Sequence, residues 1–207
     1  MESYNHIHFI LNPKDHTELV ICQHSMLSYP LHSHVSVYTA GMLLEGAVLL
    51  STPAGTGLYE ANQMFFIPPY VPHSLKAVSP YTMLTLCINK EKIITASSPA
   101  GLSVLERLRD ELEQLPERQI TIDEMADMVH ISKYHFIRSF KQEIGLTPHQ
   151  FQLQNRIRKA KLLLRQDKTI TEAALDAGFY DQSHFIKQFE KAVGMTPTAY
   201  LASCRSL

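Results

Sequence analysis

The second half of the sequence contains an internal repeat, in which residues 134–151 align with residues 183–200 at an offset of 49 positions. Seven of the eighteen aligned positions are identical, and upstream the alignment continues at an offset of 48. Because only two copies are present, a solenoid is excluded, and the fold must use one structural unit twice. The identical pairs are His135 and His184, Phe136 and Phe185, Ile137 and Ile186, Phe140 and Phe189, Gly145 and Gly194, Thr147 and Thr196, and Pro148 and Pro197.

Each copy has the pattern of a helix-turn-helix unit. A short helix of small and apolar residues, at 123–129 in copy one and 171–177 in copy two, precedes a tight turn and a second helix. Phenylalanines recur at four-residue spacing in the second helix, so we expect them to face a core. A glycine suited to a left-handed C-cap closes each copy, and a Thr-Pro pair begins the next helix. We therefore predict helix-turn-helix units at about residues 120–145 and 169–194.

The segment that joins the two copies is basic. Residues 130–168 carry nine Lys and Arg against two acids, whereas residues 104–127 carry eight acids against three Arg, although the net charge of the chain is only −1. Such a local surplus is typical of a segment that contacts phosphate. Residues 148–166 predict one helix of roughly 28 Å at 1.5 Å per residue. Taken alone, it would be an ordinary amphipathic packing helix. Between two helix-turn-helix units, it predicts reading helices held in successive major grooves of a DNA duplex.

The first half has a different pattern, with short apolar runs separated by Pro, Gly, Asn and His. Runs such as VSVYTAGMLL and YTMLTLCI have the length of strands and predict an antiparallel β domain. From residue 101 onward the period becomes helical, because Leu102, Leu105, Leu108, Leu112 and Leu115 fall on one face. The expected organisation is an all-β domain at 1–94, a linker at 95–101 and an all-α domain at 102–207.

The helical half resembles the DNA-binding domain of AraC/XylS-type bacterial transcription regulators, in which a linking helix joins two helix-turn-helix units. The resemblance covers about residues 102–202, and its specific stretches are ISKYHFIRSFKQEIGLTPHQF, RIRKAKLLL and GFYDQSHFIKQFEKAVGMTPTAY. It implies sequence-specific binding of double-stranded DNA by a regulator, more often an activator, that recruits RNA polymerase. One departure is Glu190, which aligns with Lys141 in the repeat at a position where a basic residue is common in the family.

The resemblance also implies which side chains contact DNA. Arg binds guanine through two hydrogen bonds, Gln binds adenine likewise, and Ile packs on the thymine methyl group. Lys side chains and helix N-termini mainly position a protein on phosphates. Ile137 lies at the border between core and groove faces, so burial is its alternative role. The implied base contacts are Tyr134, Ile137, Arg138, Gln182, Ser183 and Lys187, and the implied phosphate contacts are Ser132, Lys133, Lys141, Arg156 and Asp181.

Over about residues 5–90 the β half resembles the cupin-like (jelly-roll) sensor barrel that often precedes this DNA-binding domain. His32, His34 and His73 match the positions of cupin metal ligands, and three imidazoles can hold a divalent transition metal. The acidic ligand expected after the second histidine is missing, because Tyr38 and Thr39 stand there. Sensor versions of the barrel frequently lack metal, so we expect no cofactor. The histidines then line an effector pocket or are satisfied polar groups.

Several roles for the β half stay open at this point: sensing a small-molecule effector, forming a homodimer, or acting as a metal sensor or cupin metalloenzyme. The missing carboxylate disfavours an enzyme, as does the lack of a Ser/His/Asp or Cys/His arrangement. The longest apolar stretch is too short to span a bilayer, and the N-terminus lacks the pattern of a signal peptide. Three widely spaced cysteines suit a reducing compartment. We therefore expect a cytoplasmic regulator without a membrane partner.

Overall fold

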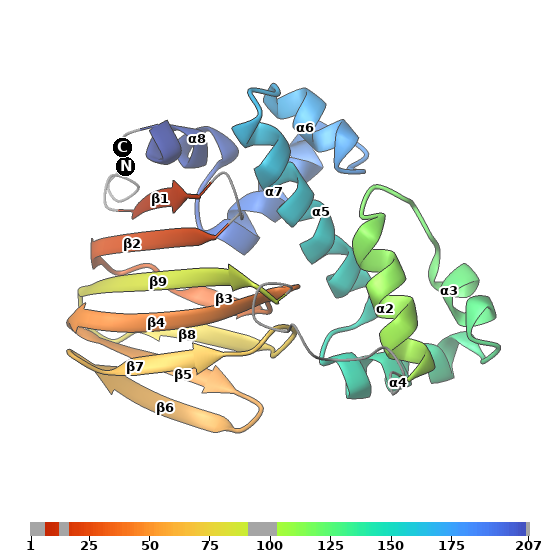
Figure 1. Ribbon diagram of the computed structural model, residues 1–207, viewed down its shortest axis with the longest axis horizontal. Coiled ribbons are helices and arrows are strands. Elements are labelled where there is room, and N and C mark those ends of the chain that lie inside the picture. The colour runs from red at the N-terminus through yellow and green to blue at the C-terminus, as the bar shows by residue number, and fades with distance from the viewer. Residues whose placement is uncertain (1–6, 13–16, 91–102, 206–207) are drawn as a thin grey trace. The chain divides into compact units, whose positions relative to one another are not determined.

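The computed structural model (Figure 1) describes residues 7–12, 17–90 and 103–205. The fold class is the predicted one, with strands in the first half and helices in the second. The predicted linker at 95–101 lies outside the described residues, as does Leu102. No helix in the described ranges is long and apolar enough to cross a membrane.

The chain divides into two compact units. One unit combines Met1–Thr95 with Ile186–Leu207, and the other comprises Ala96–Phe185. The first unit therefore contains the C-terminal end of the chain together with the β half. The second unit contains the first helix-turn-helix unit, the linking helix and the start of the second helix-turn-helix unit.

The β half is built from two antiparallel sheets, seen as two layers in Figure 1. The larger sheet has the strand order β1-β2-β9-β4-β7, and the smaller has the order β3-β8-β5-β6. Side chains alternate along each strand, so that Leu43, Val48 and Tyr81 are fully buried between the layers. The strands in the described ranges are β1 (Ile7–Leu11), β2 (Glu18–Ser25), β3 (Tyr29–His32), β4 (Val37–Glu45), β5 (Ala47–Thr52), β6 (Gly55–Glu60), β7 (Met64–Ile67), β8 (His73–Ala77) and β9 (Tyr81–Asn89).

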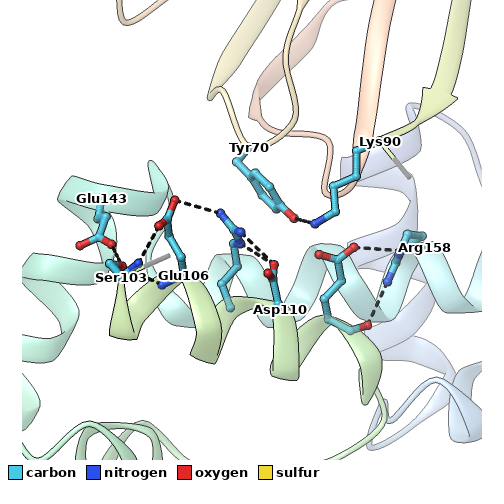
Figure 2. Close-up of polar contacts among 9 residues, drawn as sticks. Tyr70, Lys90, Ser103, Glu106, Asp110, Glu143 and Arg158 are labelled. Carbon is cyan, nitrogen blue, oxygen red and sulfur yellow. Dashed lines mark hydrogen bonds and ion pairs between the residues drawn. The ribbon is translucent and has the colours of Figure 1, made fainter. Parts of the chain in front are cut away.

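The loop between β7 and β8 is fastened to the rest of the β half at Tyr70. The Tyr70 backbone N–H donates to the carbonyl oxygen of His34 over 2.8 Å. The ammonium group of Lys90 donates to the Tyr70 hydroxyl over 2.6 Å, as Figure 2 shows. The first bond holds the segment before β8 beside the segment after β3, and the second holds it beside the end of β9.

The helical half contains short helices with well-defined starts. Thr121, Thr147 and Thr169 each form a capping box, in which the threonine side chain and the side chain three residues later satisfy each other's backbone N–H groups. The predicted packing stripe of the first helix is confirmed at Leu105, Leu108 and Leu112 but wrong at Leu115. That helix ends at Gln114, so Leu115 leaves the helical backbone and is 41% exposed. The helices in the described ranges are α2 (Val104–Gln114), α3 (Ile122–Met128), α4 (Lys133–Ile144), α5 (Pro148–Arg165), α6 (Ile170–Asp176), α7 (Gln182–Val193) and α8 (Pro197–Arg205).

Within the first compact unit, α8 packs against β1 through aromatic side chains. The ring of Tyr200 meets the ring of Phe9 edge to face, with centroids 4.9 Å apart. The ring of Tyr200 also meets the ring of Phe189 in α7 edge to face, with centroids 5.5 Å apart. This aromatic trio, Phe9, Tyr200 and Phe189, connects a strand of the β half to the second predicted reading helix.

Candidate nucleic-acid interface

The first helix-turn-helix unit consists of α3, a four-residue turn and α4. Phe136, Phe140 and Ile144 of α4 are buried, as the four-residue spacing predicted. The turn contains His130, which has a positive φ of 57°. This left-handed conformation is energetically unfavourable for any residue that has a Cβ atom. Gly145 closes α4 in the left-handed conformation, with φ 85°, and Thr147 then starts α5.

The second unit consists of α6, a turn and α7, and its turn is one residue longer, which accounts for the change of repeat offset. Gly178 aligns with His130 and also has a positive φ, of 87°. Here glycine is required for a second reason, because a Cβ atom at position 178 would lie 2.9 Å from the carbonyl oxygen of Glu117. In α7, Phe185, Phe189 and Val193 are buried as predicted.

The linking helix α5 has 18 residues and is therefore about 27 Å long. Phe151 packs edge to face on Phe140 of α4, with ring centroids 5.7 Å apart. Arg158 bonds both the side chain and the backbone carbonyl of Glu113 in α2, at 3.5 and 3.0 Å. Figure 2 shows Arg158 on α5 reaching toward α2. The helix thus packs on α4 through Phe151 and is tied to α2 through Arg158.

The residues predicted to read bases lie on the exposed side of both reading helices, with one exception. Tyr134 is 86% exposed, and Arg138 is also exposed, whereas Ile137 is only half-buried. On α7, Gln182, Ser183 and Lys187 are exposed. The side-chain oxygen of Gln182 accepts a hydrogen bond of 2.8 Å from the Thr171 hydroxyl, which leaves its two amide protons available to an acceptor.

The residues predicted to contact phosphate differ between the two reading helices. Ser132 is the N-cap of α4, yet its side chain makes no capping bond, so the first N–H groups of α4 keep their capacity to bind an anion. At the start of α7 the Asp181 carboxylate already accepts the N–H of His184 over 2.7 Å. A phosphate approaching α7 would therefore meet a negative charge at the position where α4 offers a hydroxyl.

The basic surplus seen in the sequence is reduced by ion pairing in the fold. The predicted phosphate contact Lys133 pairs with Asp123 over 2.8 Å. Among the described residues, Arg138 and Lys141 have no ion-pair partner, and both are exposed. These two side chains are therefore the cations of the first helix-turn-helix unit that are most available to bind DNA. Other pairs of the basic segment include Arg158 with Glu113, Lys159 with Glu117, and Lys168 with Asp176.

Arg156, the remaining predicted phosphate contact, is half-buried. Burial lowers the pKa of its guanidinium below the ordinary value, although arginine stays charged at neutral pH. Its Nε atom has no hydrogen-bond partner among the described residues and lies 3.3 Å from the position that a Cβ atom would take on Gly178. The Arg156 head group thus lies against the turn of the second unit.

Sequence reasoning missed Tyr180, which is 88% exposed in the longer turn just before α7. Its neighbour Phe179 is buried against Phe185, with ring centroids 5.0 Å apart. The signal in the sequence was the one-residue change of repeat offset. Phe179 aligns with Ile131 at offset 48 and Asp181 with Ser132 at offset 49, so Tyr180 is the added residue of the longer turn. An exposed ring beside a reading helix can contact a base, a sugar or a phosphate.

A second cluster of chemically active side chains lies in the β half. His32, His34 and His73 each present one ring nitrogen, and these atoms all lie within 4.8 Å of one another. The structure therefore brings together the three histidines that the sequence singled out. Burial lowers the pKa of His73 to about 4, assisted by the neighbouring His32, and burial also lowers the pKa of His32. Both imidazoles are thus neutral at pH 7.

Two helix-turn-helix units joined by one helix define a double helix-turn-helix DNA-binding fold. Residues 125–203 match a family described as a helix-turn-helix domain. The HTH-type transcriptional regulator YbfI of Bacillus subtilis, named as uncharacterised, is 35% identical over 88 residues, which are 42% of this chain and 32% of that protein. The bifunctional transcriptional activator and DNA repair enzyme Ada of Escherichia coli is 38% identical over 72 residues, which are 35% of this chain and 20% of Ada.

The fold of the whole chain is also found in a solved structure. ToxT from Vibrio cholerae, crystallised with an unsaturated fatty acid bound, superposes with a TM-score of 0.68 over 92% of this chain and 96% of ToxT, at 10% identity. The chain carries an AraC-type helix-turn-helix domain in its second half, behind an all-β first half. The match spans about a third or less of the length of these two curated relatives.

Proposed function

We propose that the chain is a sequence-specific DNA-binding transcription regulator, which acts in the cytoplasm on double-stranded DNA. The observation that carries this proposal is the exposed polar face on each of the two reading helices α4 and α7. The helix α5, about 27 Å long, joins the two helix-turn-helix units. That length suits two helices that enter successive major grooves, because one turn of the duplex is about 34 Å.

Base recognition would come mainly from Arg138 and Gln182. Arg138 is exposed and without an ion pair among the described residues, so its guanidinium is available for the two acceptors of guanine. Gln182 keeps amide donors for adenine N7, and its oxygen exchanges the Thr171 hydroxyl for the adenine amino group. Lys141 would hold a phosphate and contribute affinity without sequence preference.

The test is binding of the purified chain to a duplex selected from random sequences, compared with a scrambled duplex. We expect Arg138→Ala to weaken binding to the selected duplex by about 1–3 kcal/mol and to relax the preference at one base pair. Lys141→Ala is expected to weaken binding to both duplexes alike and to reduce the salt dependence by about one counterion. Arg107→Ala, which removes an exposed arginine of α2, is the matched control.

The outcomes of this test separate clearly. Equal losses for Arg138→Ala and Lys141→Ala on both duplexes would contradict base reading by α4. Failure of the folded wild-type chain to enrich any sequence would contradict the proposed function as a whole.

We further propose that the β half senses a small-molecule effector and that the aromatic trio transmits the signal to α7. ToxT, which shares this fold, was crystallised with an unsaturated fatty acid bound, and this supports an effector role for the β half. Within the first compact unit, Phe9 and Phe189 both contact the ring of Tyr200. A shift of β1 would therefore change the packing behind α7.

This step is tested by Phe9→Leu, which keeps an apolar side chain but removes the ring contact. We expect the variant to bind the selected duplex but to lose any change of affinity that a found effector causes in the wild type. Retention of the full effector response would exclude this route.

Homodimerisation is a separate proposal, and it rests on the outer face of the five-stranded sheet. Phe66 is 60% exposed and Met64 63% exposed, although both are large and apolar. A twofold interface places a surface against itself, so an uncharged apolar surface is self-complementary where a charged one repels. Two cross-strand rows of this face hold no charged side chain: Leu86, Ala40 and Phe66 in one row, and Leu84, Met42 and Met64 in the next.

Light scattering during gel filtration tests the dimer. We expect Phe66→Lys to give a monomer, whereas Leu58→Lys on the other sheet, at a side chain of similar exposure, leaves the dimer intact. A wild-type chain that is monomeric at tens of micromolar would contradict the proposal.

We also propose that the chain activates transcription by recruiting RNA polymerase. A reporter gene that is silent without the protein tests the sign of regulation, and we expect its expression to rise when the protein is present.

A further inference from the structure

In each helix-turn-helix unit, the second residue of the first helix contacts the first residue of the reading helix. Asp123, second in α3, accepts a hydrogen bond of 2.8 Å from Lys133, first in α4. Thr171, second in α6, donates a hydrogen bond of 2.8 Å to Gln182, first in α7. The repeat aligns position 123 with 171 and position 133 with 182. The fold therefore brings the same two positions together twice, although the residue types differ.

This contact determines what the first residue of each reading helix offers to DNA. In the first unit, the Asp123 carboxylate balances the charge of Lys133. In the second unit, the Thr171 hydroxyl holds the oxygen of the Gln182 amide, while the two N–H donors of that amide stay available. Thr171 and Gln182 are both exposed, so the bond between them competes with water and is easily exchanged.

The held and the released amide of Gln182 match different purines. In the major groove, adenine and guanine both present N7 as an acceptor. Beside N7, adenine presents an amino donor, whereas guanine presents the acceptor O6. With its oxygen held by Thr171, the amide offers donors alone, which suits N7 and O6 of guanine. With its oxygen released, the amide offers one donor and one acceptor, which suits adenine.

We infer that Thr171 is a positioning residue that lets the second reading helix accept either purine at the base pair that Gln182 contacts. This inference rests on the proposed binding of DNA by α7. Without the Thr171 hydroxyl, the Gln182 oxygen loses the partner that it has in the described part of the chain and turns to the base. Adenine is then favoured over guanine. Thr171 itself contacts no base and acts only through Gln182.

The test is selection of bound duplexes from random sequences by the full chain and its variants in parallel. In the wild type, we expect adenine and guanine to be enriched alike at one position. Thr171→Val keeps the shape of the side chain but removes the hydroxyl. It should favour adenine at that position by at least about fivefold, the lower end of the discrimination that a bidentate pair provides. Thr171→Ser restores a hydroxyl and should return the preference of the wild type.

Two further variants separate the role of Thr171 from a general effect on the fold. Thr198→Val is the matched control, because Thr198 is likewise the exposed second residue of a helix, α8, and it should leave the base preference unchanged. Gln182→Ala should lose the purine preference. The double variant Thr171→Val with Gln182→Ala should give the same result as Gln182→Ala alone, since Thr171 acts through the Gln182 amide.

The outcomes distinguish this inference from the proposed function. A folded wild type that enriches no sequence overturns both. If the wild type enriches a sequence and Thr171→Val keeps the same base preference, the role of Thr171 is overturned while DNA binding stands. The role is also overturned if the wild type selects adenine alone at that position, or if Gln182→Ala leaves the selected sequence unchanged. Far-UV circular dichroism checks that each variant is folded.

Discussion

The two helix-turn-helix units share their cores but differ where they are expected to meet phosphate. Phe136 of the first unit and Phe185 of the second are both fully buried at equivalent positions. At the start of the reading helix, however, Ser132 corresponds to an acidic cap, Asp181, and further along Lys141 corresponds to Glu190. The packing positions of the repeat have been kept while its surface charge has diverged. We therefore expect the second helix-turn-helix unit to bind DNA less tightly than the first.

The equivalence of the two cores is the part of this comparison with the largest expected effect. Phe136→Ala and Phe185→Ala should each lower the free energy of unfolding by about 3–5 kcal/mol, because each removes a fully buried ring. Urea denaturation followed by far-UV circular dichroism measures both. A loss below about 1 kcal/mol in one variant alone would mean that the two units do not depend on the same packing.

The two turns provide a smaller contrast. Gly178→Ala should destabilise the chain by about 1–3 kcal/mol, since the residue has φ 87° and its new Cβ atom would press on the Glu117 carbonyl. His130→Gly should change stability by less than about 1 kcal/mol, because relief of the left-handed strain is offset by the added freedom of glycine when unfolded. The same denaturation experiment checks both, and equal losses would refute the assignment of the strained contact to the second turn.

Exchange of the helix caps sharpens the comparison at the DNA surface. Ser132→Asp should reduce affinity for the selected duplex by about tenfold, since a carboxylate would face phosphate at the start of α4. The same substitution should leave stability unchanged or raise it by up to about 1 kcal/mol, because aspartate is a good N-cap. DNA affinity and thermal unfolding measured on one sample separate the two effects. If Ser132→Asp binds the selected duplex as tightly as the wild type does, phosphate does not lie at the start of α4.

The smallest expected effect belongs to the divergent position on α7. Glu190→Lys should strengthen binding several-fold at low salt and make the dependence of log affinity on log salt steeper by about 0.9. Glu60→Lys, an exposed acid of β6 in the β half, makes the same change of net charge and is the control. If both variants gain equally, the gain reflects net charge and not a contact of α7.

Periodicity predicted the helical elements well because their pattern is local. Three signals depend only on residues close together in the sequence: the spacing of the phenylalanines, the glycine C-caps and the Thr-Pro helix starts. Each signal occurs in both copies of the repeat. The end of α2 was mispredicted at Leu115, since an apolar residue in register does not show that the backbone is still helical. The exposure of the Tyr180 ring depends on the backbone conformation of the longer turn, which the sequence pattern does not specify.

The charges could not be placed from the sequence in the same way. The basic surplus of 130–168 counts Lys133 and Lys159 as available, but each pairs with an acid that lies 10 or 42 residues away in the chain. Such pairs depend on how helices pack, which a charge sum does not contain. The histidine cluster was foreseen from matching positions, while the carbonyl partners of His32 and His73 depend on the folded backbone. The DNA contacts assigned to Tyr134 and its neighbours stay predictions.

The contact of Tyr200 with Phe9 limits how freely a chain of this kind can exchange its parts by recombination. A crossover between residues 90 and 103 would exchange the β half for that of another protein. It would also strip α8 of its β1 partner and leave a large aromatic ring facing an unrelated surface or water. The first strand and the last helix must therefore be inherited together, although they lie far apart in the gene.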